Sequence, residues 1–285
     1  MDAFATEAQK YAAANPKIAA LKGYAFYDAG DVQEINHDYT AALALLNKAL
    51  AYGEVPFFLK DRARAYDNLK MPDAALRDIN RAIELDPADA EAYSIRCIML
   101  GNQNRMREAL RDLNTADELD PNNADYMKQR NWISGRLVYS GFELQKNGDF
   151  AGEMKDYDLA VQADPGNASV YYWRARGYLA EKKPDPAYND LEKAMALNPG
   201  YFDAYLLLDR GILTARSDWD GIIASWNKYI ALHPEDGRAY VEQGGAYFHK
   251  GDLVSAVKDA KRGADRGDAN GRMIYERFKN QVKLN

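Results

Sequence analysis

Few residues of this 285-residue chain have the types and spacing that catalysis or metal binding requires. The single cysteine, Cys97, has no histidine at a corresponding place to act as its base, so we expect an inert, buried thiol. His37, His233 and His249 are too scattered to hold a metal ion, and we expect them in or next to solvated turns. The sequence lacks a phosphate-binding loop, a dinucleotide-binding glycine motif and an HExxH zinc motif. We therefore expect no enzyme, no catalytic residue, no metal site and no cofactor.

Arginine and aspartate, in contrast, recur in step along the chain. An arginine is followed by an aspartate sixteen residues later at Arg62 and Asp78, Arg96 and Asp112, and Arg174 and Asp190. Arg210 falls at the place of the arginines, and Asp156 and Asp259 at that of the aspartates. The planar guanidinium suits a carboxylate, so these residues could form a ladder that fixes helix register, within or between repeats, or a charged stripe for a partner. We favour the ladder, because each arginine is adjacent to a small residue expected to be buried.

Composition excludes several classes of function. The chain has 37 Lys and Arg and 43 Asp and Glu residues, so its formal net charge is −6. Nucleic-acid binders are normally basic, because they must neutralise phosphates. We therefore expect no nucleic-acid partner, and, because no run of 18 apolar residues exists, no membrane insertion. The first seven residues carry acid and no basic segment, so as written they are not a signal peptide. We expect a cytoplasmic location, and a periplasmic one if an export signal was removed.

Five prolines mark a repeat of about 34 residues. Pro87, Pro121, Pro165, Pro199 and Pro234 follow similar dipeptides, and the steps between them are 34, 44, 34 and 35 residues. Small residues lie 5, 12 and 24 places before most of these prolines, and large residues lie between them. Alanines seven residues apart share one helix face, small residues let two helices approach closely, and proline ends the second helix. The pattern predicts a repeated helix–turn–helix element.

This pattern resembles the tetratricopeptide repeat family in its bacterial multi-repeat form. The segment 148–165, GDFAGEMKDYDLAVQADP, is similar to the turn and second helix of that family, and the likeness covers roughly residues 16–270. It implies an all-α fold, a right-handed α-solenoid of about seven helix pairs with a capping helix at each end. Glu153 stands where the family has alanine, which predicts looser packing at that place.

In this register the repeats span about 16–55, 56–89, 90–123, 124–167, 168–203, 204–236 and 237–270. We expect residues 1–15 to form an N-terminal capping helix. Residues 271–285 should form a C-terminal capping helix, amphipathic from Arg272 to Val282. The first repeat is divergent: we expect helices from Pro16 to Tyr27 and from Asp38 to Ala51, joined by a long connection over 28–37.

The step of 44 residues places ten extra residues in the repeat 124–167. The simplest account is a first helix that is ten residues longer, or about 15 Å at the usual helical rise. The alternative is an extra loop or short helix near residues 131–135. We favour the long helix, because residues 124–146 contain no proline and only two glycines.

The resemblance also implies where a partner would bind. First helices of this family line a concave groove, and the groove places of this chain hold aromatic residues and cations: Tyr24, Phe57, Lys60, Arg64, Phe142, Tyr172 and Arg176. We expect them to form the partner site, since aromatic residues and arginine are enriched at binding hot spots. They suit a peptide or protein segment with acidic and apolar side chains. A clamp for a chaperone's C-terminal carboxylate is disfavoured, because only Lys60 matches the family's clamp residues.

The expected function is a non-catalytic protein–protein interaction module, an adaptor or scaffold that holds a peptide or protein segment in the groove. The alternative is a self-assembling structural scaffold that forms homo-oligomers through groove or end-helix contacts. Light scattering separates the two, because an oligomer that depends on concentration favours the alternative.

Overall fold

The computed structural model describes residues 16–282, and the regular secondary structure in that range is helical. The predicted all-α class of stacked helix pairs is confirmed. The expected N-terminal capping helix, 1–15, lies outside the described residues. The chain divides into two compact units: the N-terminal unit ends at Ile133 and the C-terminal unit begins at Ser134. None of the described helices is both long enough and apolar enough to cross a membrane.

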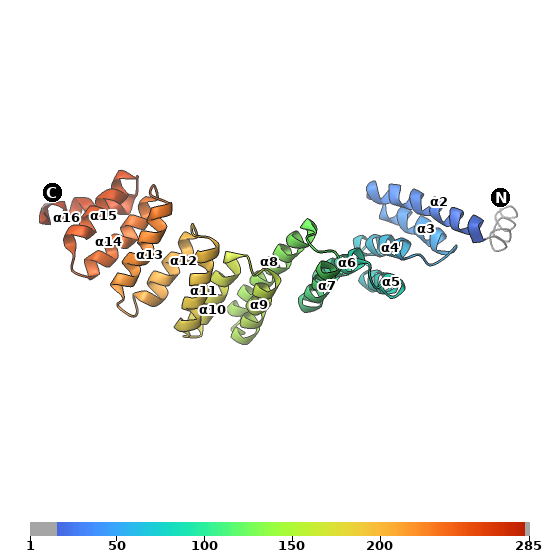
Figure 1. Ribbon diagram of the computed structural model, residues 1–285, viewed down its shortest axis with the longest axis horizontal. Helices are drawn as coiled ribbons and strands as arrows, with labels where there is room; N and C mark the ends of the chain where they lie inside the picture. The colour runs from blue at the N-terminus through green and yellow to red at the C-terminus, as the bar shows by residue number, and fades with distance from the viewer. Residues whose placement is uncertain (1–15, 283–285) are drawn as a thin grey trace. The chain divides into compact units, whose positions relative to one another are not determined.

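The N-terminal unit is built of helix pairs joined by short turns (Figure 1). The elements are α2 (Pro16–Ile35) and α3 (Tyr39–Leu50), α4 (Pro56–Asn68) and α5 (Pro72–Leu85), α6 (Ala90–Asn102) and α7 (Met106–Leu119), and then the start of α8 (Ala124–Lys146).

The C-terminal unit continues the same pattern from the second part of α8. Its elements are α9 (Phe150–Ala163), α10 (Ala168–Ala180) and α11 (Pro184–Leu197), α12 (Phe202–Leu208) with the π-helical segment η1 (Asp209–Leu213), α13 (Trp219–Leu232), α14 (Gly237–His249) and α15 (Leu253–Asp265), and α16 (Ala269–Phe278).

Local sequence signals explain where these helices begin and end. Many helices start after an aspartate or asparagine whose side chain accepts a backbone N–H bond, as at Asp38, Asp89 and Asn167. Helices α2, α4, α5 and α11 begin with proline, whose missing N–H is not needed in the first turn. As predicted, second helices end two residues before a repeat proline, for example α5 at Leu85 before Pro87.

The predicted small residues lie at the helix contacts. Ala82, Ala116, Ala160 and Ala194 have no exposed surface, as expected for close backbone approach. The prediction of looser packing at Glu153 is wrong, because this side chain is fully buried. Gly177 leaves room for it: a Cβ atom there would lie 3.2 Å from Glu153 Oε1.

The divergent first repeat is more regular than expected. Its second helix is confirmed, with Asp38 and Ala51 as the caps of α3. The long connection over 28–37 is wrong, because α2 continues to Ile35. Gly30 permits this, since a Cβ atom there would lie 3.3 Å from Leu46 in α3. The helix thus gains packing against α3 that offsets the intrinsic cost of glycine.

Two further expectations concern helix length. The long first helix of the repeat 124–167 is confirmed: α8 has 23 residues where α10 has 13. The C-terminal helix exists but is displaced from the expected Arg272–Val282. α16 begins at Ala269, because the Asp268 side chain accepts from the Gly271 N–H, and it ends at Phe278.

Candidate functional site

The Arg–Asp ladder is formed, and it joins helices. Arg96 donates from Nε and Nη2 to Asp112 on the second helix of its own pair, at 2.7 Å for each bond. Its Nη1 donates to Asn80 in the preceding pair at 2.8 Å. Both arrangements left open by the sequence, within and between repeats, therefore occur together. The same geometry recurs for Arg62 with Asp78 and Asn47, and for Arg174 with Asp190 and Asp158.

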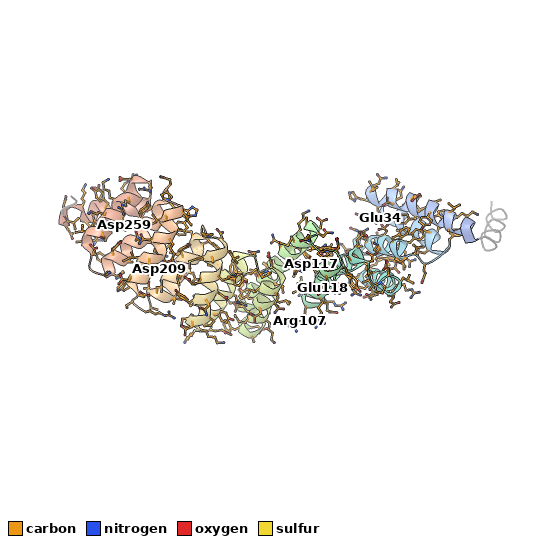
Figure 2. All side chains as sticks on the ribbon, in the orientation of Figure 1. Glu34, Arg107, Asp117, Glu118, Asp209 and Asp259 are labelled. Carbon is orange, nitrogen blue, oxygen red and sulfur yellow. The ribbon has the colours of Figure 1, made fainter. Side chains whose placement is uncertain are left out.

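The ladder changes in the later repeats. Arg210 is not part of it, contrary to expectation, and its exposed side chain donates to Glu242 at 2.7 Å. The π-helical segment η1 shifts the register, so that Asp209 is buried and accepts from Trp226 Nε1 at 2.9 Å. Asp259 accepts from Arg262, which lies on the same helix, α15. Figure 2 labels both Asp259 and Asp209. Arg62, Arg96 and Arg174 therefore join neighbouring helices, as the ladder interpretation predicted.

The first helices of the N-terminal unit carry a hollow. It has a volume of about 650 Å³ and is lined by residues of α4, α6, the α7–α8 turn and the start of α8. Arg64 contributes from α4, and Glu91, Ser94 and Ile98 contribute from α6. We call this surface the N-unit face. Of the predicted site residues, Arg64 lines it directly.

Carboxylates of the protein itself neutralise both predicted cations of the N-terminal unit. Lys60 is 8% exposed, and its Nζ lies 2.7 Å from Asp89 and 2.6 Å from Glu91. Burial acts to lower the pKa of Lys60, but the hydrogen bonds to Asp89 and Glu91 raise it overall. Arg64 donates to Asp61 at 2.7 Å and also to Glu91. Lys60 and Arg64 thus hold Glu91 at the edge of the hollow.

The predicted aromatic residues of this unit form one cluster between α2 and α4. Tyr24, 45% exposed, packs on Phe57 and Phe58 with ring centroids 5.6 and 5.5 Å apart. Tyr27 lies 4.9 Å from both phenylalanine rings. Much of this aromatic surface packs between the two helices, and Tyr24 remains partly exposed.

The predicted residues of the C-terminal unit gather around a tryptophan. Trp173 on α10 contacts Phe142 of α8 and Tyr172, with centroids 5.8 and 5.7 Å away. The Arg176 guanidinium lies 4.6 Å from the Trp173 ring centroid. Tyr201, in the turn before α12, lies 5.1 Å from Tyr172. We call these five side chains, all half-buried, the C-unit aromatic cluster.

Arg176 differs from Arg64 in its charge environment. Among the described residues, no carboxylate lies within ion-pair distance of Arg176. The buried Glu153 is near enough for Arg176 to lower its pKa, but burial is stronger and raises that pKa overall. Glu153 Oε1 accepts from Gln145 at 2.9 Å, and Oε2 is buried without a partner. Arg176 therefore makes no ion pair with the described residues, although it acts on Glu153 and bonds the Tyr172 hydroxyl.

The predicted site residues thus fall into two groups, one in each unit. Tyr24, Phe57, Lys60 and Arg64 belong to the N-terminal unit; Phe142, Tyr172 and Arg176 belong to the C-terminal unit. Sequence reasoning missed Trp173, and it placed Glu91 at a groove place without including it among the site residues. Trp173 was detectable, because it lies three residues before Arg176 on the same helix. Glu91 was detectable as an acidic residue at a groove place one repeat after Lys60.

The reactive residues considered from the sequence have structural surroundings. Burial raises the pKa of the Cys97 thiol to about 12, so the thiolate is disfavoured at neutral pH. The rings of His249 and Trp219 stack with centroids 4.8 Å apart, and His233 packs on Tyr229. The described residues contain no group of three or more His, Cys, Asp or Glu side chains that could hold a metal ion.

Known protein families and sequences give the chain its context. A tetratricopeptide repeat family model matches residues 61–89. Human tetratricopeptide repeat protein 16 is 31% identical over 111 residues, which cover 35% of this chain and 13% of that protein. Mouse sperm-associated antigen 1 is 33% identical over 103 residues, 36% of this chain and 10% of the other. The chain therefore matches only a small part of these longer proteins.

Solved structures resemble the chain at low overall similarity. The tetratricopeptide repeat protein YrrB, described as having an unusual peptide-binding site, has a TM-score of 0.41 at 19% identity, covering 71% of this chain and 97% of YrrB. The first tetratricopeptide domain of Spaghetti (RPAP3), bound to an HSP90 peptide, has a TM-score of 0.39 at 27% identity and covers 41% of this chain and 94% of that domain.

Proposed function

We propose that this chain, which belongs to the tetratricopeptide repeat family, is a non-catalytic adaptor or scaffold that holds a peptide or protein segment against its first helices. The proposed contact residues are Tyr24, Phe57 and Arg64 in the N-terminal unit, and Phe142, Tyr172 and Arg176 in the C-terminal unit. Lys60 is buried and does not contact the partner directly; its ion pair positions Glu91 at this surface.

The observation that carries the proposal is the hollow of about 650 Å³ on the N-unit face. Its lining mixes the apolar Ile95 and Ile98 with the polar Ser94 and Gln129. Such a surface can bury apolar side chains of a bound segment and also hydrogen-bond its backbone. The buried, high-pKa thiol of Cys97 and the packed histidines favour binding over catalysis as the activity of this surface.

The test is the binding of peptides selected on the full chain from a random library displayed on phage. The affinity of a selected peptide is measured by fluorescence anisotropy for the wild type and for Arg64→Glu with Arg176→Glu. We expect the double variant to bind at least about tenfold more weakly, because the favourable charge at Arg176 is reversed and Arg64→Glu places a carboxylate beside Asp61 and Glu91 at the hollow.

A matched control makes the same change of charge on second helices. Arg77 in α5 and Lys193 in α11 are exposed, one in each unit, and we expect Arg77→Glu with Lys193→Glu to bind nearly as the wild type does. Circular dichroism melts verify that both variants are folded. Equal effects of the two double variants, or no effect of either, would contradict a site on the first helices.

Self-assembly is a second candidate function, favoured by one feature of the C-terminal unit. Helices α14, α15 and α16 enclose a hollow of about 250 Å³ with apolar lining residues such as Val241, Ile274 and Phe278. Phe248, which also lines it, is 51% exposed. Light scattering over a range of concentrations tests this candidate. A monomer at every concentration would exclude it.

A further inference from the structure

The C-unit aromatic cluster combines a half-buried cation with flat apolar surface. Phe142, Tyr172, Trp173 and Tyr201 come from α8, α10 and the turn before α12, and they lie next to one another through ring contacts of 5.1 to 5.8 Å. Arg176 lies over Trp173, which fixes the guanidinium against an apolar wall. A guanidinium in this position is partly shielded from water, so an ion pair made there is stronger than one at an open surface.

The charges around the cluster leave that guanidinium uncompensated. Lys146, 4.4 Å from the centroid of Phe142, pairs with Glu143 at 2.8 Å, and Lys183 pairs with Glu181 at 2.8 Å. Glu153 is bonded to Gln145 and lies outside ion-pair distance of Arg176. The negative charge of Asp203 raises the pKa of the Tyr172 and Tyr201 hydroxyls.

The N-unit face provides the contrast. Arg64 in its lining and Lys60 beside it hold Asp61, Asp89 and Glu91 in ion pairs. A ligand carboxylate at Arg64 would have to displace Glu91, which would then lose one of its two cationic partners. A ligand carboxylate at Arg176 displaces no internal carboxylate, because the side chain that Arg176 bonds is the neutral Tyr172 hydroxyl.

We infer that Arg176 and the C-unit aromatic cluster form a subsite for a peptide segment in which an aspartate or glutamate adjoins an aromatic or aliphatic side chain. The carboxylate accepts from the Arg176 guanidinium, and the neighbouring apolar side chain packs on Phe142 and Tyr172. The N-unit face contributes contacts that do not depend on a ligand carboxylate. This inference rests on the proposed function, and it makes Arg176 the residue that recognises the acidic side chain of the segment.

The test uses a library of random 12-residue peptides displayed on phage and selected separately on four full-length proteins. These are the wild type, Arg176→Gln, Arg176→Lys, and the control Arg272→Gln, which removes an exposed arginine of α16. We expect wild type and control to enrich peptides with Asp or Glu beside an apolar residue. Arg176→Gln should still select peptides but lose the acidic preference. Arg176→Lys should keep a weaker one, because lysine lacks the planar fork.

A binding cycle gives the magnitude. For a peptide selected on the wild type, changing its acidic residue to the matching amide should weaken binding about tenfold, and should have almost no effect with Arg176→Gln. An acidic preference that survives in Arg176→Gln would overturn the inference and leave the proposed function intact. Peptides without acidic enrichment on the wild type would do the same. Failure to select any peptide would contradict the proposed function itself, and this inference with it.

Discussion

A single arginine in the ladder ties together three helices. Arg96 makes two bonds to Asp112 in α7 and one to Asn80 in α5, while its own backbone is part of α6. The side chains of Arg96 and Asp112 are 23% and 9% exposed, so most of their charge is removed from water. Removing one partner leaves the other charge buried without compensation, which costs more than losing the bonds alone.

We therefore expect Arg96→Ala and Asp112→Ala each to lower the free energy of unfolding by about 2 kcal/mol, with a coupling energy of about 1–2 kcal/mol in the double variant. Urea denaturation followed by circular dichroism measures all four proteins. Arg105 and Glu108 form the control, since they make the same two-bond pair but in solvent, and their cycle should show little coupling. Additive effects of Arg96→Ala and Asp112→Ala would show that the observed pair does not stabilise the fold.

Glu34, labelled in Figure 2, makes the stability of the N-terminal unit depend on pH. Burial raises the pKa of Glu34 to about 7, Asp61 and Asp31 add to the shift, and Arg64 opposes it. Its Oε1 is buried without a hydrogen-bond partner. The folded state then binds the proton more tightly than the unfolded state. The contribution of Glu34 is therefore most favourable below about pH 4.5 and is lost as the pH rises to about 7.

Glu34→Gln should consequently stabilise the protein at pH 7 by about 1–2 kcal/mol, a range reduced for the partial exposure of this side chain. It should also remove the part of the pH dependence that lies between about pH 4.5 and 7. Thermal melts at half-unit pH steps provide the measurement. Glu118→Gln changes an exposed carboxylate of α7 and controls for net charge. If both variants follow the same curve, burial of Glu34 is not the cause.

At the scale of the helix, much of the fold was predictable because its signals are local. Proline is tolerated in the first turn of a helix but ends one elsewhere, and alanines seven residues apart lie on one helix face whatever the neighbours are. The length of α8 followed from the same arithmetic. The continuation of α2 through Gly30 and the π-helical turn at Asp209–Leu213 could not be predicted, because each depends on packing against the next helix.

The candidate site was less predictable for the same reason. The residue types at the groove places identified Arg64 and Arg176 as equivalent, since each occupies the same position of its repeat. Their difference arises from Glu91, which is 27 residues from Arg64 in sequence but bonded to it. Pairings over such separations depend on how helices pack, and periodicity alone does not reveal them.

Helix α8 offers a test of its continuity through its two glycines. A Cβ atom at Gly135 would meet nothing within 4 Å, so Gly135→Ala should stabilise the protein by about 1 kcal/mol through helix propensity alone. At Gly141 a Cβ atom would lie 2.6 Å from the Tyr157 ring, so Gly141→Ala should destabilise by about 1–3 kcal/mol. Denaturant titration compares the two. A gain at Gly135 requires helix there, and no gain would indicate a loop instead.

For the chain as a whole, stacked helix pairs imply that stability is transmitted between neighbours. Elements in such a stack contact the pairs before and after them, so their energies add along the chain rather than through one common core. α16 closes the C-terminal unit: Gly271 approaches the α15 backbone so closely that a Cβ atom would lie 2.8 Å from Ala264 N. Removing α16 would expose the apolar hollow that it forms with α14 and α15.

Deletion of residues 269–285 should therefore destabilise the neighbouring helices of the C-terminal unit and leave the N-terminal unit unchanged. Amide hydrogen exchange, read by mass spectrometry of peptides, should show reduced protection in α14 and α15, a smaller loss in α13, and unchanged protection in α4–α7. Met273→Gln is the control, since Met273 is 63% exposed on α16 and its change should leave exchange nearly as in the wild type. An equal loss of protection in both units would mean that the chain unfolds as one cooperative body. A loss that fades from α15 towards α13 would show that each helix pair derives its stability from its immediate neighbours.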